Sequence, residues 1–399
     1  MVKAVFDIVI SGGGIAGLTA AAAFGAAGFK VQVVDPAPPV TQRDRAGADL
    51  RTTAFLQPAQ KLLEQAGLWK ALAAHAAPLQ IMRIVDAGGP EPKARLVKDF
   101  DAKDISEQPF GWNLPNWLLR REFIAHLQTL HNVDLRLGVA TSELFTRTNE
   151  ATVRLSDGST SRCKLVIAAD GRNSKIREAA GIGVKTTRYG QKALALAVTH
   201  PIPHENVSTE IHRSGGPFTL VPLPDYNGMP SSALVWMERA ATANALFELD
   251  DTALEAAMTE RSCGLYGPLN LASQRTIWPI ISQLADRLTA QRVALVAEAA
   301  HVVPPIGAQG LNTSLGDMQI LLDLAKATPG DLGSAEMLET YQKKRMSEVR
   351  LRVKGIDLLN RASMVEQPAL RNIRALGLNA LYGMAPVRKM LMQMGLGAR

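Results

Sequence analysis

Residues 8–35 read IVISGGGIAGLTAAAAFGAAGFKVQVVD. A short apolar run is followed by three consecutive glycines, an alanine-rich stretch that ends near Gly28, and a second apolar run that closes at Asp35. Apolar runs bounded by turn residues are typical of buried strands, and the alanine-rich stretch between them is typical of a helix. The stretch therefore predicts a strand, turn, helix and strand of the βαβ type near the start of the chain.

The glycines at the first turn are spaced as Gly12-x-Gly14-x-x-Gly17. In a dinucleotide-binding turn, the first glycine permits the tight turn, the second lets a pyrophosphate approach the backbone, and the third lets the helix pack closely on the sheet. Asp35 ends the second strand, where a carboxylate can accept hydrogen bonds from a ribose. The residues predicted to bind a nucleotide cofactor are Gly12, Gly14, Ile15, Ala16, Gly17 and Asp35. The alternative is a turn whose glycines only satisfy a positive φ.

The composition indicates an ordinary globular protein. The chain has 399 residues, of which 47% are hydrophobic and 20% charged, enough for two or three domains. Its two cysteines, Cys163 and Cys263, lack a partner motif, so we expect small buried side chains rather than a disulfide framework or a zinc site. No apolar run reaches the roughly 18–20 residues that cross a bilayer, and the first residues lack the features of a signal peptide. The cysteine pattern therefore predicts no bound metal. Together with the lack of a membrane span, it leads us to expect a cytoplasmic protein.

The basic charge is concentrated at the carboxyl end. Residues 341–399 contain twelve Lys or Arg and three Asp or Glu, a balance of +9, whereas the whole chain carries +7. The first 340 residues are therefore slightly acidic, and they contain no basic patch with interleaved aromatic residues. This distribution argues against a nucleic-acid partner.

The rest of the chain changes pattern in blocks. We predict strands at 81–86, 94–101 and 292–297, helices at 58–66, 119–130, 242–262 and from about 312, a hairpin of Val153–Leu155 with Leu165–Ala168, and an antiparallel sheet within 184–240. The predicted fold class is α/β. A Rossmann-like nucleotide-binding domain is assembled from the discontinuous segments 1–75, 102–180 and 276–340, a β-sheet substrate domain is inserted at 76–101 and 181–275, and 341–399 form a basic, amphipathic helical tail.

Two later segments extend the cofactor motif. Residues 165–177 read LVIAADGRNSKIR, and residues 292–301 read RVALVAEAAH, followed by Pro305, Gln309-Gly310, Asn312 and Asp317. With the glycine turn, and in the same order, they resemble the fingerprints of FAD-dependent aromatic-ring hydroxylases, flavoprotein monooxygenases of the para-hydroxybenzoate hydroxylase fold. Asp49-Leu50-Arg51 and Asn116-x-x-Leu119-Arg120 also stand where this family places arginines against the flavin.

The resemblance implies FAD as the cofactor and adds residues to the predicted site. These are Arg51, Arg120, Asp170, Gly171, Glu298, Pro305, Gly307, Gln309, Gly310, Leu311 and Asn312. Read without the family, 170–177 is a strand-to-helix turn capped by Ser174 with Arg177 in a surface ion pair, 304–310 is a rigid loop, and both arginines are solvated. The chain has Ala297-Glu298 where the family usually has Gly-Asp, and Ala308-Gln309-Gly310 for Gly-Gln-Gly, which leaves the strength of FAD binding open.

The family's chemistry implies that NADH or NADPH reduces the FAD, that O2 adds at C4a of the flavin, and that the hydroperoxide transfers one oxygen atom to an electron-rich phenol. Because the cofactor supplies this chemistry, no protein nucleophile is expected. Candidates for an apolar pocket are Phe218, Leu220, Pro222, Trp236 and Pro305, each of which also fits a role as plain core. His212 and His301 are candidates for assisting phenol deprotonation, or they are structural histidines.

Within the family, Phe110-Gly111-Trp112, the segments 216–223 and 232–236, and Asn360-Arg361 resemble the ubiquinone-biosynthesis hydroxylases. This resemblance implies a polyprenyl phenol and O2 as substrates. Two alternatives stay open: a hydroxylase of a small soluble aromatic compound, and an assembly subunit that has lost its flavin.

The basic tail carries two amphipathic faces. One consists of Val349, Val353, Ile356 and Leu359, and the other of Val387, Met390, Leu391 and Met394. Basic amphipathic helices dock on anionic membranes or on partner proteins. Helices packed onto the cofactor domain are the alternative. We therefore expect a cytoplasmic enzyme that is either free or peripheral at the inner membrane, where the tail contacts the membrane or a ubiquinone-biosynthesis complex.

Overall fold

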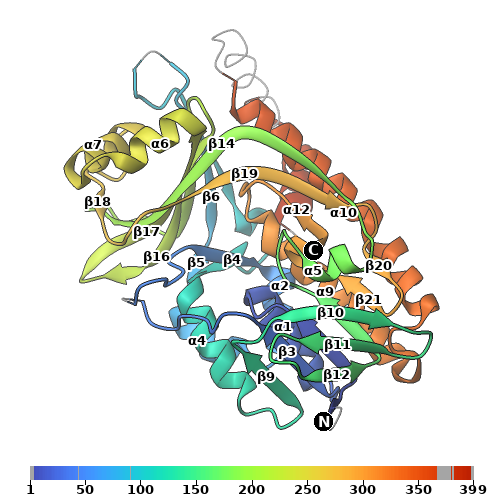
Figure 1. The fold of residues 1–399 in the computed structure, drawn as a ribbon. Coiled ribbons are helices and arrows are strands. Elements are labelled where there is room, and N and C mark those ends of the chain that lie inside the picture. Colours follow the sequence, from blue (N-terminus) through green and yellow to red (C-terminus); the bar gives the residue numbers. More distant parts are fainter. Residues whose placement is uncertain (1–3, 44, 90, 366–378, 380–381, 397–399) are drawn as a thin grey trace.

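The computed structural model describes residues 4–43, 45–89, 91–365, 379 and 382–396. A six-stranded sheet has the order β20-β21-β13-β2-β3-β9. Figure 1 labels four of its strands, β3, β9, β20 and β21. Its strands are β2 (Ile8–Ser11), β3 (Val31–Asp35), β9 (Val133–Leu137), β13 (Leu165–Ala168), β20 (Thr289–Ala290) and β21 (Val293–Leu295). All neighbours pair in parallel except β20 and β21. Because α1 (Ile15–Ala26) connects β2 to β3, the predicted βαβ unit is present.

Helices and a small sheet pack around the six-stranded sheet, and together they form what we call the cofactor domain. The helices α2 (Gln57–Gln65), α4 (Asn116–Leu127) and α9 (Gln309–Ala327) pack against α1. A four-stranded sheet shares the same hydrophobic core and consists, in order, of β1 (Ala4–Val5), β12 (Thr160–Cys163), β11 (Ala151–Leu155) and β10 (Thr141–Thr146).

The predicted hairpin is wrong in one of its strands. β11 pairs with β12 around the Asp157-Gly158 turn, whereas Leu165–Ala168 is β13, a parallel strand inside the six-stranded sheet. All four residues of β13 are buried. A continuous apolar run is typical of a parallel strand that is covered on both faces, and it does not fit a hairpin at the surface.

A nine-stranded sheet forms the second layer, with the order β22-β19-β14-β17-β16-β15-β6-β7 and β18 paired to β14. Its strands are β6 (Ile81–Asp86), β7 (Leu96–Asp101), β14 (Val184–Thr199), β15 (Val207–His212), β16 (Pro217–Tyr226), β17 (Met229–Arg239), β18 (Asn270–Leu271), β19 (Thr276–Ala285) and β22 (His301–Val302). The predicted domain boundary at residue 276 is wrong, because β19 pairs along β14 and continues this sheet to Ala285.

Two helices, α6 (Ala240–Glu248) and α7 (Asp251–Arg261), cover one face of the nine-stranded sheet (Figure 1). The sequence predicted a single helix over 242–262. The helix is interrupted because Asp250 caps a new one: its carboxylate accepts a hydrogen bond from the Ala253 amide at 2.8 Å.

A three-stranded sheet lies between the two larger ones. It consists, in order, of β4 (Thr52–Leu56), β8 (Gly111–Pro115) and β5 (Ala77–Leu79). The Asn113 side chain on β8 donates to the Pro222 carbonyl oxygen on β16 at 2.9 Å and so connects this sheet to the nine-stranded one. The remaining short elements are α3 (Trp69–Leu72), η1 (Ala73–His75), η2 (Ala102–Asp104), α5 (Lys175–Ala179), α8 (Ala297–Ala300) and η3 (Pro329–Asp331).

The carboxyl-terminal part contains α10 (Ala335–Ser363) and α12 (Ala385–Leu396). α10 packs on the cofactor domain, where Tyr341, Arg345 and Val349 are buried. The predicted face on this helix is therefore right for Val349 and Ile356, which are buried, and wrong for Leu359, which is exposed. Residues 366–378, 380–381 and 397–399 of the predicted tail lie outside the described residues.

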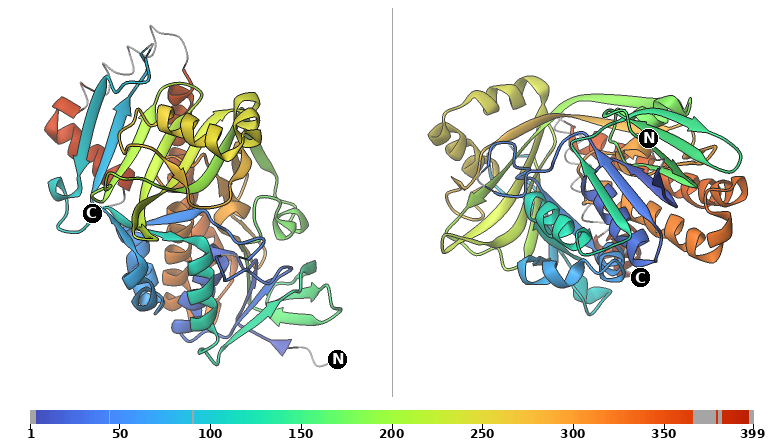
Figure 2. Two further views of the ribbon diagram at one scale, coloured as in Figure 1. Left: turned by 90° about the vertical axis from the view of Figure 1, so that its left-hand side faces the viewer. Right: turned by 60° about the horizontal axis from the view of Figure 1, so that its bottom comes forward.

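The second tail helix, α12, lies beside β6 and β7 (Figure 2, left). Arg388 at its start forms an ion pair with Asp104 at 3.1 Å. Met392 is buried, whereas Met390 and Met394 are exposed. Within the described ranges, no helix combines the length and the apolar character that a membrane span requires.

Candidate cofactor and substrate site

A cavity of about 610 Å³ lies between the cofactor domain and the nine-stranded sheet. Both domains line it, and so does the three-stranded sheet through β4, Leu79 and Asn113. The predicted cofactor residues that line it are Gly14, Ile15, Ala16, Arg51, Arg120, Gly171, Glu298, Pro305, Gly307, Gln309, Gly310 and Leu311. Gly12, Gly17, Asp35, Asp170 and Asn312 are not among its lining residues. Segments far apart in the sequence therefore converge on one site.

The glycines of the Gly12–Gly17 turn have two different roles: two of them leave no room for a side chain, and one faces open space. A Cβ atom on Gly12, whose φ is +112°, would lie 2.2 Å from the Ala169 carbonyl oxygen. A Cβ on Gly17 would lie 1.9 Å from the Gly12 carbonyl oxygen. Both glycines are thus required by the packing of α1 on the sheet. Gly14, at the N-terminus of α1, differs, because apart from its chain neighbours no atom in the described part of the chain lies within 4 Å of the position its Cβ would take. This open cradle fits a pyrophosphate against the backbone amides.

Asp35 supports the turn from the end of β3. Its carboxylate accepts hydrogen bonds from the Gly13 amide at 2.6 Å and from the Ala37 amide at 2.9 Å. A Cβ on Gly13 would lie 2.8 Å from the Cβ of Asp35, so the two residues are in close contact. The structure therefore gives Asp35 a role in shaping the turn, and its predicted contact with a ribose stays a prediction.

The Asp170 segment has a free acceptor at the carboxyl end of β13. Oδ2 of Asp170 accepts a hydrogen bond from the Ile176 amide at 3.1 Å, whereas Oδ1 is buried and has no partner among the described residues. Gly171 follows with a φ of +84° and open space at its Cβ position. A buried oxygen without a partner is costly. This acceptor beside an open glycine fits a hydroxyl or amide group of a bound nucleotide.

Arg177 joins two of the fingerprint segments. Its side chain is buried and donates to the carbonyl oxygens of Ala299 and Arg172, both at 2.9 Å. The alternative of a surface ion pair is therefore wrong for this residue. The other part of that alternative holds, because Ser174 caps α5 by accepting from the Arg177 amide at 3.0 Å.

Arg51 and Arg120 share one carboxylate at the edge of the cavity. Arg51 donates from Nε and Nη2 to the two oxygens of Asp49, each at 2.8 Å, and Nη2 of Arg120 approaches Oδ2 at 3.3 Å. Asn116 donates to the same oxygen at 3.1 Å. Burial raises the pKa of Asp49, but the hydrogen bonds and charges of Arg51 and its neighbours outweigh it and lower that pKa below its ordinary value. The cluster therefore presents fixed positive charge to the cavity.

Two departures from the family pattern fall on unusual backbone. Ala297 has a φ of +54°, and Ala308, which precedes α9, has a φ of +56°. Glycine adopts this left-handed region without strain, whereas alanine does so at a cost of roughly 1–2 kcal/mol. Both departures thus keep the backbone that a glycine would favour. Asn312, on α9, donates to the carbonyl oxygens of Ala54 and Ala308, both at 2.7 Å, and so holds this loop against β4.

Replacing Ala297 by glycine is expected to stabilise the chain. The variant Ala297→Gly should raise the free energy of unfolding by about 0.5–1 kcal/mol, because relief of left-handed strain exceeds the added chain entropy. Urea denaturation measures this change. Ala256→Gly is the matched control, since Ala256 lies exposed inside α7 and should lose about 1 kcal/mol. A loss of similar size in both variants would contradict the assignment of strain.

A buried ionic network links the cavity wall at His301 to α9 and α10. His301 lines the cavity, and its Nε2 lies 2.7 Å from Oδ2 of Asp317. Nε of Arg345, on α10, donates to Oδ1 of the same carboxylate at 2.8 Å. The side chains of His301, Asp317 and Arg345 are 1%, 0% and 2% exposed. Burial raises the pKa of Asp317, but the charges and hydrogen bonds of His301 and Arg345 outweigh it and hold that pKa below its ordinary value. His301 is thus part of a structural network.

The predicted pocket residues need correction. Phe218, Leu220 and Trp236 lie on the other face of the nine-stranded sheet, in the core beneath α6 and α7, and do not line the cavity. Side chains alternate between the faces of a strand, so the residues adjacent to them line it instead: Thr219, Val221 and Val235. Pro222 is buried, and only its carbonyl oxygen contributes, by holding Asn113. Pro305 does line the cavity.

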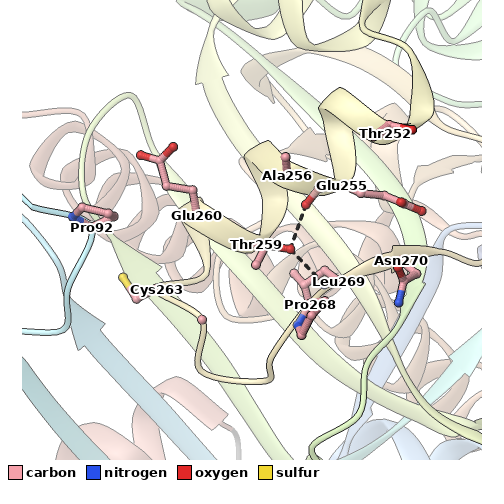
Figure 3. Close-up of a pocket in the computed structure, with 11 residues that line it drawn as sticks. Pro92, Thr252, Glu255, Ala256, Thr259, Glu260, Cys263, Pro268, Leu269 and Asn270 are labelled. Carbon is pink, nitrogen blue, oxygen red and sulfur yellow. Dashed lines mark hydrogen bonds between the residues drawn. The ribbon is translucent and has the colours of Figure 1, made fainter.

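A separate hollow lies on the outer side of α7 (Figure 3). It is lined by residues between Thr252 and Asn270 and by Pro92. In this hollow the Thr259 hydroxyl donates a hydrogen bond to the Glu255 carbonyl oxygen and accepts one from the Leu269 amide, which connects α7 to the segment that follows it. Cys263, predicted to be buried, borders this hollow and is half-buried. The hollow is remote from the fingerprint segments, so it is not the cofactor site.

Comparison with known proteins agrees with this geometry. Residues 5–355 match the family described as FAD binding domain. The chain belongs to this family. Ubiquinone hydroxylase UbiL of Rhodospirillum rubrum is 32% identical over 396 residues, which cover 98% of this chain and 90% of that protein. The 3-demethoxyubiquinol 3-hydroxylase of Escherichia coli is 27% identical over 405 residues, which cover 98% of each protein.

The fold is also found among solved structures. The crystal structure of p-nitrophenol 4-monooxygenase PnpA from Pseudomonas putida superposes with a TM-score of 0.79 at 18% identity and covers 100% of both chains. The predicted family, its ubiquinone-biosynthesis subgroup, the fold class and FAD as cofactor are therefore confirmed. The chain is an FAD-dependent aromatic-ring monooxygenase. The alternative of a flavin-free assembly subunit is not supported.

Proposed function

We propose that this FAD-binding domain family member hydroxylates the aromatic ring of a polyprenyl phenol in ubiquinone biosynthesis, with O2 and with NADH or NADPH as reductant. The observation that carries the proposal is the shared cavity, which holds the cofactor turn on one side and a largely apolar sheet wall on the other. The two relatives at 32% and 27% identity are named for hydroxylation in ubiquinone biosynthesis, and this chain matches nearly all of each.

The protein's own residues would hold FAD and shield the reacting ring. The open amides at Gly14, the free oxygen of Asp170 and the arginine pair at Asp49 are placed to bind the phosphates and hydroxyls of the cofactor. FAD supplies the oxygen-transfer chemistry when it is bound. The sheet wall and the 301–310 loop would enclose the substrate ring and exclude water from it.

An apolar end of the cavity supports a hydrocarbon tail on the substrate. Leu56, Met82 and Phe110 line the cavity and also pack in a cluster with Met392 of α12. The helix α12 therefore covers the end of the cavity that is lined by these side chains. A prenyl chain that reached this end would lie among apolar groups, and each buried methylene contributes about 0.8 kcal/mol.

Preference for a prenylated phenol tests the function. The FAD-loaded enzyme is assayed with NADH or NADPH, using a short-chain polyprenyl phenol and the same phenol without its chain. We expect kcat/KM for ring hydroxylation to be at least about tenfold higher for the prenylated compound, since two buried methylenes suffice for that ratio. Equal or better turnover of the free phenol would favour a small soluble aromatic substrate instead.

We further propose that the enzyme is peripheral at the inner membrane and docks through α12. The outer surface of this helix exposes Met390, Leu391 and Met394. Lys389 is exposed on the same helix, and near an anionic surface a basic residue contributes about 1 kcal/mol. A lipid substrate that enters beside α12 would then pass from the membrane into the cavity.

The exposed methionines test this docking. The double substitution Met390→Ser and Met394→Ser should lower sedimentation with anionic liposomes about tenfold and leave FAD binding unchanged, because it removes apolar surface without touching the cavity. Phe145→Ser is the matched control, since Phe145 is exposed on β10 of the cofactor domain. Unchanged sedimentation of the double variant, or of a chain lacking residues 384–399, would contradict docking.

A further inference from the structure

The sheet wall of the cavity has one polar cluster. On β6 and on β14 to β19, the lining residues are apolar or aromatic except for Ser208, Glu210 and Thr219. Ser208 and Glu210 are two apart on β15 and share a face, and Thr219 on β16 lies opposite Glu210 in the sheet register. A wall of this kind matches a ligand that combines one polar ring with a long hydrocarbon.

Glu210 is the acid of this cluster, and its carboxylate is only half satisfied. The residue is 6% exposed, and its Oε1 lies 2.8 Å from Nε2 of His212. Its Oε2 makes no hydrogen bond or ion pair with the residues that the structure describes, and it is not one of the fully buried polar atoms, so it is open to the cavity that Glu210 lines. A carboxylate that is mostly buried but keeps one oxygen open to an otherwise apolar cavity is a candidate for contact with a ligand.

His212 fixes the direction of this carboxylate. The two residues stand on the same face of β15, and the His212 side chain is 15% exposed. On the neighbouring strand β6, Asp86 pairs in register with His212 and forms an ion pair with Arg95 at 2.6 Å. Asp49 and Glu298, the other acidic lining residues, belong to the arginine cluster and to the cofactor loop. Glu210 is therefore the acid that faces the cavity from the substrate side.

We propose that Oε2 of Glu210 accepts a hydrogen bond from the phenolic hydroxyl of the substrate and that His212 is a positioning residue for this carboxylate. The inference rests on the proposed function. The hydrogen bond shifts electron density from the O–H bond into the ring, which makes a ring carbon a better nucleophile toward an oxygen donor. No covalent bond to the protein forms, and the proton stays shared between the phenol oxygen and Oε2. Thr219 and Ser208 are placed beside it for other polar groups of the ring.

The isosteric variant Glu210→Gln tests this contact on the FAD-loaded enzyme. We expect kcat for hydroxylation of a short-chain polyprenyl phenol to fall about 100-fold, with a smaller change in KM. A ring-fluorinated analogue, whose hydroxyl is more acidic, should recover most of the loss because it depends less on an acceptor. Glu210→Asp, which keeps the carboxylate, should retain more activity than Glu210→Gln. His212→Gln should lower kcat by a smaller factor than Glu210→Gln, and the fluorinated phenol should again recover most of that loss.

The control is Glu260→Gln, an acid on α7 that is exposed and lies outside the cavity. It should match the wild type on both phenols. Normal turnover by Glu210→Gln overturns the inference, and so does an equal loss on the ordinary and the fluorinated phenol, because a purely structural residue would not distinguish them. If the wild-type chain binds FAD but hydroxylates neither phenol, the proposed function fails and this inference fails with it.

Discussion

Gly14→Val is expected to abolish FAD binding while the chain stays folded. Apart from its chain neighbours, no atom of the described residues lies within 4 Å of the position that a Cβ on Gly14 would take, so the free chain has open space where the larger side chain begins. The same side chain would occupy the place where a pyrophosphate approaches the first turn of α1. We expect the dissociation constant for FAD to rise at least about 100-fold, which corresponds to about 2.8 kcal/mol. Titration of the apoprotein with FAD, followed by flavin absorbance, measures the change.

A matched control separates this effect from a loss of structure. Gly330, in η3, likewise has no atom of the described residues within 4 Å of its Cβ position apart from its chain neighbours, and it does not line the cavity. Gly330→Val should bind FAD as the wild type does. Thermal unfolding of the Gly14→Val apoprotein should differ from that of the wild-type apoprotein by no more than about 1 kcal/mol. Normal FAD binding by Gly14→Val would contradict the placement of the cofactor.

Asp317→Asn is expected to lower the free energy of unfolding by about 3–5 kcal/mol at neutral pH, because it leaves the buried Arg345 guanidinium without its main counter-charge. Asp323→Asn on the same helix, where the carboxylate is exposed, should change stability by no more than about 0.5 kcal/mol. Urea denaturation of both variants measures the difference. Equal small effects would contradict the role of the buried network in attaching α10.

The same network predicts how stability depends on pH. The pKa of Asp317 is lower in the folded chain than its ordinary value, because His301 and Arg345 outweigh the effect of burial. The stabilisation is therefore complete above the unfolded pKa of about 4 and is lost as the pH falls through the folded pKa. The stability difference between wild type and Asp317→Asn should be full at neutral pH and should shrink below about pH 4. A difference that grew toward acid pH would contradict this sign.

The cofactor side of the site is readable from sequence because its signals are local. The Gly12–Gly17 turn lies between an apolar strand and an alanine-rich helix, so spacing and periodicity together predict it. The later fingerprints also follow buried strands. Their convergence follows from a parallel sheet, whose strands present their carboxyl ends at the same edge.

The substrate side is harder to read because both faces of its strands are buried. On β16, Phe218 packs beneath the helices while Thr219 faces the cavity, and hydrophobicity does not say which face meets α6 and α7. The sequence does not single out Glu210 for the same reason, although a charged residue two positions from a histidine within a strand is a usable signal. In the sequence Arg345 is one of many basic residues near the carboxyl end, and its pairing with Asp317 depends on how α10 packs against α9.

Oxygen incorporation tests the central claim most directly. The FAD-loaded chain is supplied with NADH or NADPH, a short-chain polyprenyl phenol and isotopically labelled O2, and the products are analysed by mass spectrometry. We predict a hydroxylated ring that carries one labelled oxygen atom, formed only when both FAD and the reductant are present. Oxidation of the reductant with release of hydrogen peroxide and no labelled ring product, from a chain that binds FAD, would contradict the claim that this cavity hydroxylates a polyprenyl phenol.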